Sequence, residues 1–157
     1  MSQQLSHGTI SISKTIKVPA EKVFSAWVDP KARSIWGPPS EDEAIEFLKD
    51  DFRVGGVDVH RCGQKNDLRF RVETHYYQIN RPHRLLFTER VSTDDSLLSA
   101  SVITVAISEN KSVTELEVTI QIASLVGSGM IDGTHNGWQS ALSNLAAHLE
   151  ATNAEIE

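Results

Sequence analysis

Three side chains of this sequence combine a reactive type with a position suited to a buried site. His135 lies on the apolar stripe of the C-terminal segment, one turn before Trp138. That spacing fits a polar anchor or general base in a pocket, and equally a histidine at a helix start that bonds a loop carbonyl. Glu89 shares a strand face with Leu85 and Phe87. If that face is inward, burial would raise the carboxyl pKa and make Glu89 a catalytic candidate, whereas an outward Glu89 would be ordinary.

The third reactive side chain, His60, stands two residues from both Asp58 and Cys62. Alternation along a strand places all three on one face. A metal site would need further ligands, and the sequence contains no Cys-x-x-Cys or His-Glu-x-x-His pattern, so we predict none. His60 could instead offer a polar contact to a pocket, while Cys62 is typical of a small packed thiol.

Aromatic side chains are the second class of candidate. Tyr76 belongs by alternation to the inward face of a strand and Tyr77 to the outward face, unless a bulge exchanges them. Trp36 and Trp138 could form flat walls for a ligand, or simply belong to the core. Periodicity alone leaves both choices open.

The elements that would position these residues can be read from periodicity. Residues 8–17 alternate as a strand, and residues 18–27 suit a short helix. Asp29 followed by Pro30 predicts the start of a second short helix that carries Trp36. Alternation and turn residues then predict further strands, and Gly55 with Gly56 marks a sharp reversal. The expected strands cover residues 43–50, 57–62, 68–77, 85–91, 98–108 and 113–123.

A long helix closes the chain. Apolar residues recur at spacings of three and four from Ile131 to Leu149. Because Gly133 and Gly137 weaken its first turns, we expect it to start near Thr134 or to be kinked there. The element order indicates one α+β domain over residues 1–157, with a curved antiparallel sheet around the C-terminal helix.

Composition excludes several classes of function. A net charge of −6 without a cluster of Lys and Arg argues against nucleic acid or an anionic membrane as a partner. The single cysteine rules out an internal disulfide, and no leader or spanning segment is apparent. We therefore expect a cytoplasmic protein. No phosphate-binding loop or serine-hydrolase elbow is present, and we predict no cofactor.

Six segments in order resemble the SRPBCC superfamily, whose START-like or birch-pollen-allergen-like domains have a helix-grip fold. Within it the chain is most similar to homologues of the activator of heat-shock-protein-ninety ATPase. The segments are residues 18–27, residues 29–36, residues 51–56, residues 77–87, residues 101–105 and residues 137–145. The resemblance implies an internal pocket for a lipophilic or aromatic small molecule, and often a homodimer. The eukaryotic co-chaperone has an additional chaperone-binding domain for which this chain has no room, so a chaperone partner is not expected.

We therefore predict that the protein binds a small hydrophobic or aromatic molecule between the sheet and the C-terminal helix. The alternatives are a cyclase, dehydratase or hydrolase that uses His135 or Glu89 in the same cavity, and a stress-related interaction module resembling a co-chaperone. The predicted ligand-binding residues are Trp36, His60, Phe70, Tyr76, Phe87, Thr104, Ile120, His135, Trp138 and Leu142.

Overall fold

The structure is a computed structural model that describes residues 4–156. The chain forms one seven-stranded sheet, two short helices and one long helix. The strands are β1 (Ser6–Ile16), β2 (Glu43–Lys49), β3 (Val57–Gln64), β4 (Asp67–Asn80), β5 (Arg84–Ser92), β6 (Leu97–Asn110) and β7 (Val113–Ser124). The helices are α1 (Ala20–Val28), α2 (Pro30–Trp36) and α3 (Ser128–Ile156).

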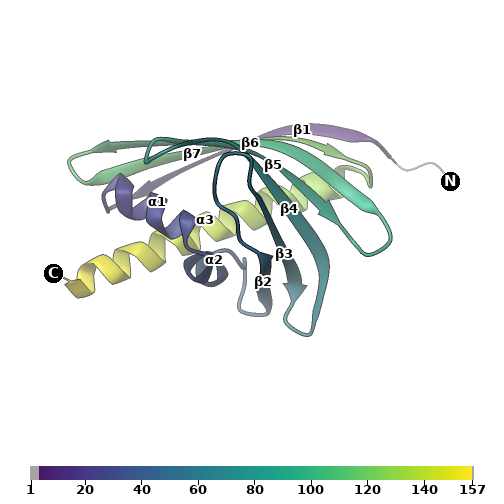
Figure 1. Ribbon diagram of the computed structural model, residues 1–157, viewed down its shortest axis with the longest axis horizontal. Helices are drawn as coiled ribbons and strands as arrows, with labels where there is room; N and C mark the ends of the chain where they lie inside the picture. Colours follow the sequence, from purple (N-terminus) through teal and green to yellow (C-terminus); the bar gives the residue numbers. More distant parts are fainter. Residues whose placement is uncertain (1–3, 157) are drawn as a thin grey trace.

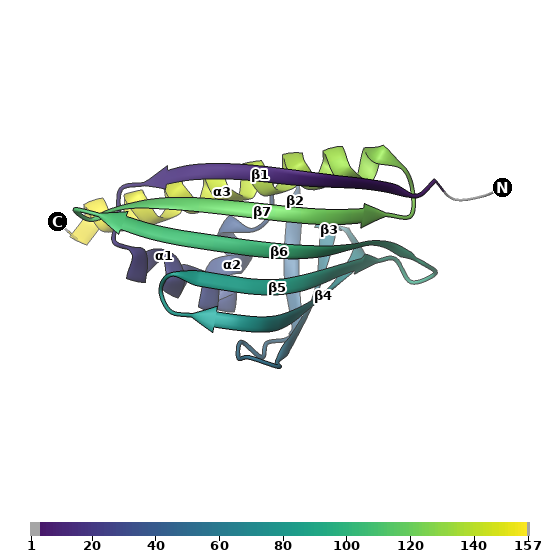
Figure 2. The same cartoon turned by 90° about the horizontal axis from the view of Figure 1, so that it is seen from above.

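The strand order is β1-β7-β6-β5-β4-β3-β2, and every neighbouring pair is antiparallel. Figure 1 shows the sheet curving over α3, with α1 and α2 on the same side as the long helix. Seen from above, α3 runs along β1 and β7 at one edge of the sheet (Figure 2). This is the predicted α+β helix-grip arrangement, with two short helices after the first strand.

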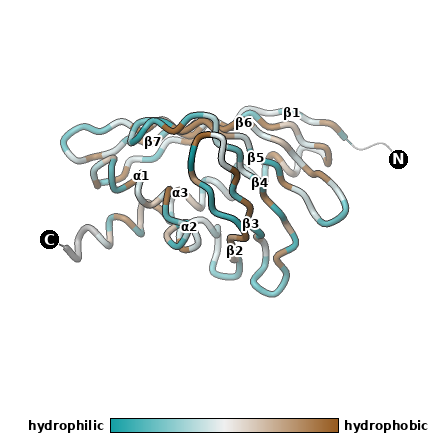
Figure 3. Tube along the Cα trace, viewed as in Figure 1, coloured by the Kyte–Doolittle hydropathy of each residue, from teal (hydrophilic) through white to brown (hydrophobic). Residues whose placement is uncertain are grey.

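Alternation along the strands fixes which side chains face inward. On β7 the residues Leu116, Val118 and Ile120 are almost fully buried, while Glu115 and Glu117 are exposed. Coloured by hydropathy, the chain shows hydrophobic positions along the strands and mostly hydrophilic loops (Figure 3). The concave face of the sheet therefore carries the core, because its apolar side chains are removed from water there.

The short helices begin and end for local reasons. The Asp29 carboxylate accepts a hydrogen bond from the backbone N–H of Lys31 at 3.0 Å, which caps α2, and Pro30 occupies its first helical position. The Trp36 indole N–H donates to the carbonyl of Ala26 at 3.1 Å and ties the end of α2 to α1. This contact places Trp36 under the sheet.

The long helix differs from the expectation. It begins at Ser128, not near Thr134, and passes through Gly133 and Gly137 without ending. The reason is tertiary packing, which outweighs glycine's low helix propensity. The first turns rest on β1, where Ile131 lies so close to Gly8 that a Cβ there would be 3.1 Å from its methyl group.

Among the described residues, no helix is long and apolar enough to cross a membrane.

Candidate functional site

A cavity of about 420 Å³ lies between the inner face of β2–β5, the two short helices and the first half of α3. Seven of its lining side chains are aromatic. The rings that line it are Trp27, Trp36, Phe47, Phe70, Tyr76, Phe87 and Trp138. A cavity with such walls suits a flat apolar molecule, because buried ring contacts add about 0.5–1.5 kcal/mol to the gain from area burial.

Three tryptophans form one wall of the cavity. The ring centroids of Trp27 and Trp36 are 5.1 Å apart, and Trp27 stacks on Trp138 at 6.1 Å. Trp27 and Trp36 come from α1 and α2, whereas Trp138 comes from α3. The cluster therefore joins all three helices at the cavity.

The helix α3 presents glycines to the cavity. Gly133 and Gly137 both line it, and a Cβ added at either would meet no atom within 4 Å. Being four residues apart, they lie on the same side of the helix. Together they leave open the space that larger side chains would fill.

A buried polar cluster closes the cavity on the side of α2. The Asp58 carboxylate is completely buried, and it accepts hydrogen bonds from the Tyr76 hydroxyl, from the Arg33 guanidinium at 3.0 Å and from the backbone N–H of Asp51 at 2.6 Å. Arg33 also pairs with Asp50 at 3.1 Å. Burial raises the pKa of the Tyr76 phenol, so its hydroxyl stays protonated and donates to Asp58.

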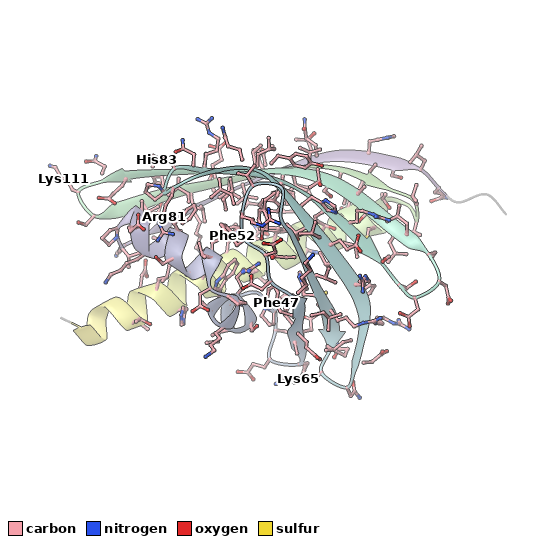
Figure 4. All side chains as sticks on the ribbon, viewed as in Figure 1. Phe47, Phe52, Lys65, Arg81, His83 and Lys111 are labelled. Carbon is pink, nitrogen blue, oxygen red and sulfur yellow. The ribbon has the colours of Figure 1, made fainter. Side chains whose placement is uncertain are left out.

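Two aromatic side chains, Phe47 and Phe52, pack against this cluster; both are labelled in Figure 4. The Arg33 guanidinium lies 4.4 Å above the centre of the Phe47 ring, and the Phe52 ring packs on Tyr76 at 4.6 Å. A cation over an aromatic face is attracted by the ring's quadrupole. Arg33 is thus held by two carboxylates and a ring, in a fixed place at the cavity wall.

His60 faces the cavity as an uncharged imidazole. Burial and, to a smaller extent, the neighbouring Arg33 charge lower its pKa to about 4, although Asp58 acts in the opposite direction. Its Nδ1 is buried without a hydrogen-bond partner among the described residues. The ring lies 5.2 Å from that of Phe47. At neutral pH His60 can therefore offer a neutral polar group to a ligand.

Glu89 also lines the cavity, on the inner face of β5. Burial raises its pKa to about 7. Cys62 is nearby, and burial together with the charges of Glu89 and Glu43 raises its pKa to about 12, so the thiol is unreactive. Within the described part of the chain, no three His, Cys, Asp or Glu side chains are arranged to hold a metal ion.

Six of the ten predicted binding residues line the cavity: Trp36, His60, Phe70, Tyr76, Phe87 and Trp138. Tyr76 is inward and Tyr77 is 59% exposed, so the strand irregularity between Tyr76 and Gln78 does not exchange them. The catalytic candidate Glu89 is inward as well. These residues lie on strands β3–β5 or on helix surfaces that meet the sheet.

The other four do not line the cavity. Thr104 is exposed on the outer face of β6, where the register places Ile103 and Val105 inward instead. Ile120 and Leu142 are fully buried, but they form the core beside β1 and β7 and are not the cavity floor. The prediction was wrong for Thr104 because both faces of β6 carry apolar residues, which hides the phase.

His135 is the fourth predicted binding residue that does not line the cavity. It is half-buried on α3, two residues from both Gly133 and Gly137. Since an α-helix turns about 100° per residue, a residue two positions away points to the opposite side. Trp138 on the same apolar stripe does line the cavity, so membership of the stripe alone did not decide which residues face it.

Sequence reasoning missed Trp27, Arg33, Phe47 and Glu43 as cavity residues. Arg33 had a usable signal, because residues three apart on a helix share a face and Trp36 was already placed inward. For Phe47 the alternation with Ile45 was available, but nothing indicated which face of the edge strand β2 was inner.

A curved antiparallel sheet that encloses an apolar cavity against a long C-terminal helix defines a helix-grip domain. The chain belongs to the family described as activator of Hsp90 ATPase homolog 1-like protein, whose model matches residues 17–150.

Solved structures agree with this assignment. A protein from Rhizobium leguminosarum superposes with a TM-score of 0.83 at 25% identity, covering 96% of this chain and 99% of that one. The Mll3558 protein from Rhizobium loti superposes with a TM-score of 0.79 at 30% identity, covering 92% of this chain and 98% of that one. The AHSA1-like protein from Aeromonas hydrophila superposes with a TM-score of 0.72 at 25% identity, covering 93% of this chain and 94% of that one. No curated protein sequence matches the chain significantly.

Proposed function

We propose that the protein binds a small hydrophobic or aromatic molecule in the cavity between the sheet and α3. The observation that carries the proposal is the cavity itself, of about 420 Å³ with seven aromatic rings in its lining. Removal of apolar ligand surface from water would supply most of the affinity, at about 25 cal/mol per Å² before ordering costs.

The glycines of α3 support the proposal. A larger side chain at Gly133 or Gly137 would favour the helix and could fill the space beside it, yet both cavity-lining positions are glycine. A cavity kept open at the expense of helix propensity is what a binding protein needs. An interaction module that used only its outer surface would have no use for it.

The test uses Gly137→Leu, which fills the cavity from the helix side. We expect wild-type protein to bind the uncharged dye N-phenylnaphthylamine with enhanced fluorescence, and Gly137→Leu to bind it at least about tenfold more weakly, which corresponds to about 1.4 kcal/mol. Leucine is a better helix former than glycine, so the variant should unfold at the same or a higher temperature. Loss of binding would then reflect occlusion and not unfolding.

Gly129→Leu is the matched control. Gly129 lies on the same helix and also has open space around it, but it does not line the cavity. The Gly129→Leu variant should therefore bind the dye as the wild type does. Failure of the wild type to bind, or equal binding by all three proteins, would contradict the proposed function.

A second candidate is an acid–base enzyme that works in the same cavity. It is favoured by Glu89 and His60, two titratable groups of one cavity whose pKa values of about 7 and about 4 have moved in opposite directions from their usual ones. Mass spectrometry of bound ligands after incubation tests it. Unchanged ligands with every cavity binder would count against catalysis.

A further inference from the structure

The Glu89 carboxylate lines the cavity. Its backbone pairs with Thr74 on β4 and Ser101 on β6, so the side chain projects from the middle of the concave face. In the described part of the structure, no side chain or backbone group donates a hydrogen bond to it. By contrast, Asp58 has three donors. A half-buried carboxylate without protein donors is costly to shield from water, and a ligand could provide the missing partner.

The charges around the cavity favour a cationic partner. The positive charge of Arg33 is already matched by Asp58 and Asp50. Glu43 and Glu89 add two carboxylates to the lining, and His60 is uncharged at neutral pH. The groups near the cavity therefore sum to a negative charge when Glu89 is ionised.

The walls also suit a cation. Aromatic faces attract ammonium groups, most strongly in the case of tryptophan, and this cavity contains Trp27, Trp36 and Trp138. A negatively charged ligand would meet Glu89 and Glu43, and Arg33, the cation of the lining, already has its charge balanced by Asp58 and Asp50. A purely apolar ligand would leave the Glu89 carboxylate buried and unpaired.

We propose that the cavity selects an amphipathic amine, with an apolar or aromatic body against the rings and a protonated amino group paired with Glu89. This inference rests on the proposed function and specifies the class of ligand. The amine donates to the carboxylate as a charge-assisted hydrogen bond, which is stronger than a neutral one. Glu89 is thus the specificity-determining residue of the site.

Binding should then depend on pH. The groups with displaced pKa values that face the cavity are His60 and Cys62 on β3, Tyr76 on β4 and Glu89 on β5, and only Glu89 has a pKa between 6 and 8. Arg33 comes from α2 and Glu43 from β2. Beside them, β4 and α3 contribute Thr74 and Thr134 to the lining, and β6 places Ser101 opposite Glu89. Ionisation of Glu89 should therefore strengthen amine binding by about tenfold from pH 6 to pH 8.

The experiment compares naphthylmethylamine, naphthylmethanol and naphthoic acid, which share one ring system and differ in charge. Each displaces N-phenylnaphthylamine from the wild type, Glu89→Gln and Glu43→Gln at pH 6 and pH 8. For the wild type at pH 8 we expect the amine to bind about tenfold or more tightly than the alcohol, and the acid to bind most weakly.

Glu89→Gln keeps the shape of the side chain and removes its charge. It should abolish the preference for the amine and its pH dependence, so that the amine and the alcohol bind with similar affinity. Glu43→Gln is the matched control, because it removes another carboxylate of the same lining. It should retain the preference.

The outcomes separate the two proposals. Dye binding with equal affinity for the three probes, a preference for the acid, or an amine preference that survives in Glu89→Gln would overturn the inference and leave the proposed function standing. Loss of the preference in Glu43→Gln alone would also overturn it. If neither the dye nor any probe binds, the proposed function fails and the inference fails with it.

Discussion

At the scale of residues, the site depends on a buried carboxylate with a complete set of partners. Asp58 has no exposure to solvent, and Arg33 has a side-chain exposure of 11%. Their contact is therefore a buried ion pair. Its net contribution to stability is small, but breaking it leaves an uncompensated charge in the interior.

Replacing Arg33 with methionine tests this cluster. Methionine keeps most of the volume and leaves Asp58 without its cation, so we expect the free energy of unfolding to fall by about 3–5 kcal/mol. Urea denaturation measures the change. Arg53→Met is the control, because Arg53 pairs with Asp51 at the surface with 67% side-chain exposure, and its loss should cost less than about 1 kcal/mol. Equal effects of the two variants would show that Arg33 is not a buried partner.

The residue scale also shows where sequence reasoning works. Residues two apart on a strand share a face, so placing Phe70 inward also placed Tyr76 inward. Glu89 and His60 could be assigned only conditionally, since alternation gives the two faces but not which one is covered. His135 was misplaced because an apolar stripe identifies the buried side of a helix and not the part of it over a cavity.

At the scale of elements, the loop between β2 and β3 holds the polar cluster in place. The backbone N–H of Gly55 donates to the carbonyl of Tyr76 at 2.8 Å, and the N–H of Tyr76 donates to the carbonyl of Gly56 at 3.1 Å. Gly55 has a φ of +84°, a conformation that glycine adopts readily. The sharp reversal predicted from the two glycines is therefore real, and it fixes Tyr76 next to Asp58.

Gly56→Ala should disturb this loop. A Cβ at Gly56 would overlap the carbonyl oxygen of Asp51 and lie 2.9 Å from that of Arg53, and backbone atoms cannot move aside as a flexible side chain can. We expect a loss of more than about 1 kcal/mol in the free energy of unfolding, measured by thermal denaturation. Gly129→Ala, in open space on α3, should be neutral or stabilising. A Gly56→Ala protein as stable as the wild type would mean that a Cβ at this position does not clash with the carbonyl oxygens of Asp51 and Arg53.

The order and type of the elements could be predicted from the sequence because alternation, turn residues and the Asp29–Pro30 cap are local signals. The start of α3 could not. Its first turns contain Gly129 and Gly133, which disfavour a helix, and they are held by packing against β1 over more than 100 intervening residues. Single-sequence propensity does not include such a contact.

At the scale of the whole molecule, two cavity residues give opposite pH dependences to folding. The folded-state pKa of Glu89 is raised from 4.5 to about 7, so the folded protein binds the proton more tightly and stability falls as the pH rises through this range. The folded-state pKa of His60 is lowered from 6.5 to about 4, so the unfolded chain binds the proton more tightly and stability rises with pH through that range. The two effects partly cancel between about pH 4.5 and 6.5.

Comparison of the wild type with Glu89→Gln isolates the carboxylate, because both proteins keep His60. A tenfold change in proton affinity corresponds to about 1.4 kcal/mol, so the move from 4.5 to about 7 sets an upper bound of about 3 kcal/mol, reduced by water in the cavity. Relative to the wild type, Glu89→Gln should therefore gain stability between pH 5 and pH 8, by up to that amount.

Urea denaturation of both proteins across pH 5–8, without ligand, measures this difference, and Glu43→Gln provides the control curve. Parallel curves for the wild type and Glu89→Gln would show that Glu89 is ordinarily solvated. A gain that vanishes when a saturating amine is present would show the opposite, because a bound cation lowers the pKa of the carboxylate it pairs with. The same carboxylate that destabilises the empty protein at pH 8 would then be the group that makes an amine ligand stabilising, since ligand binding to the folded state adds directly to its stability.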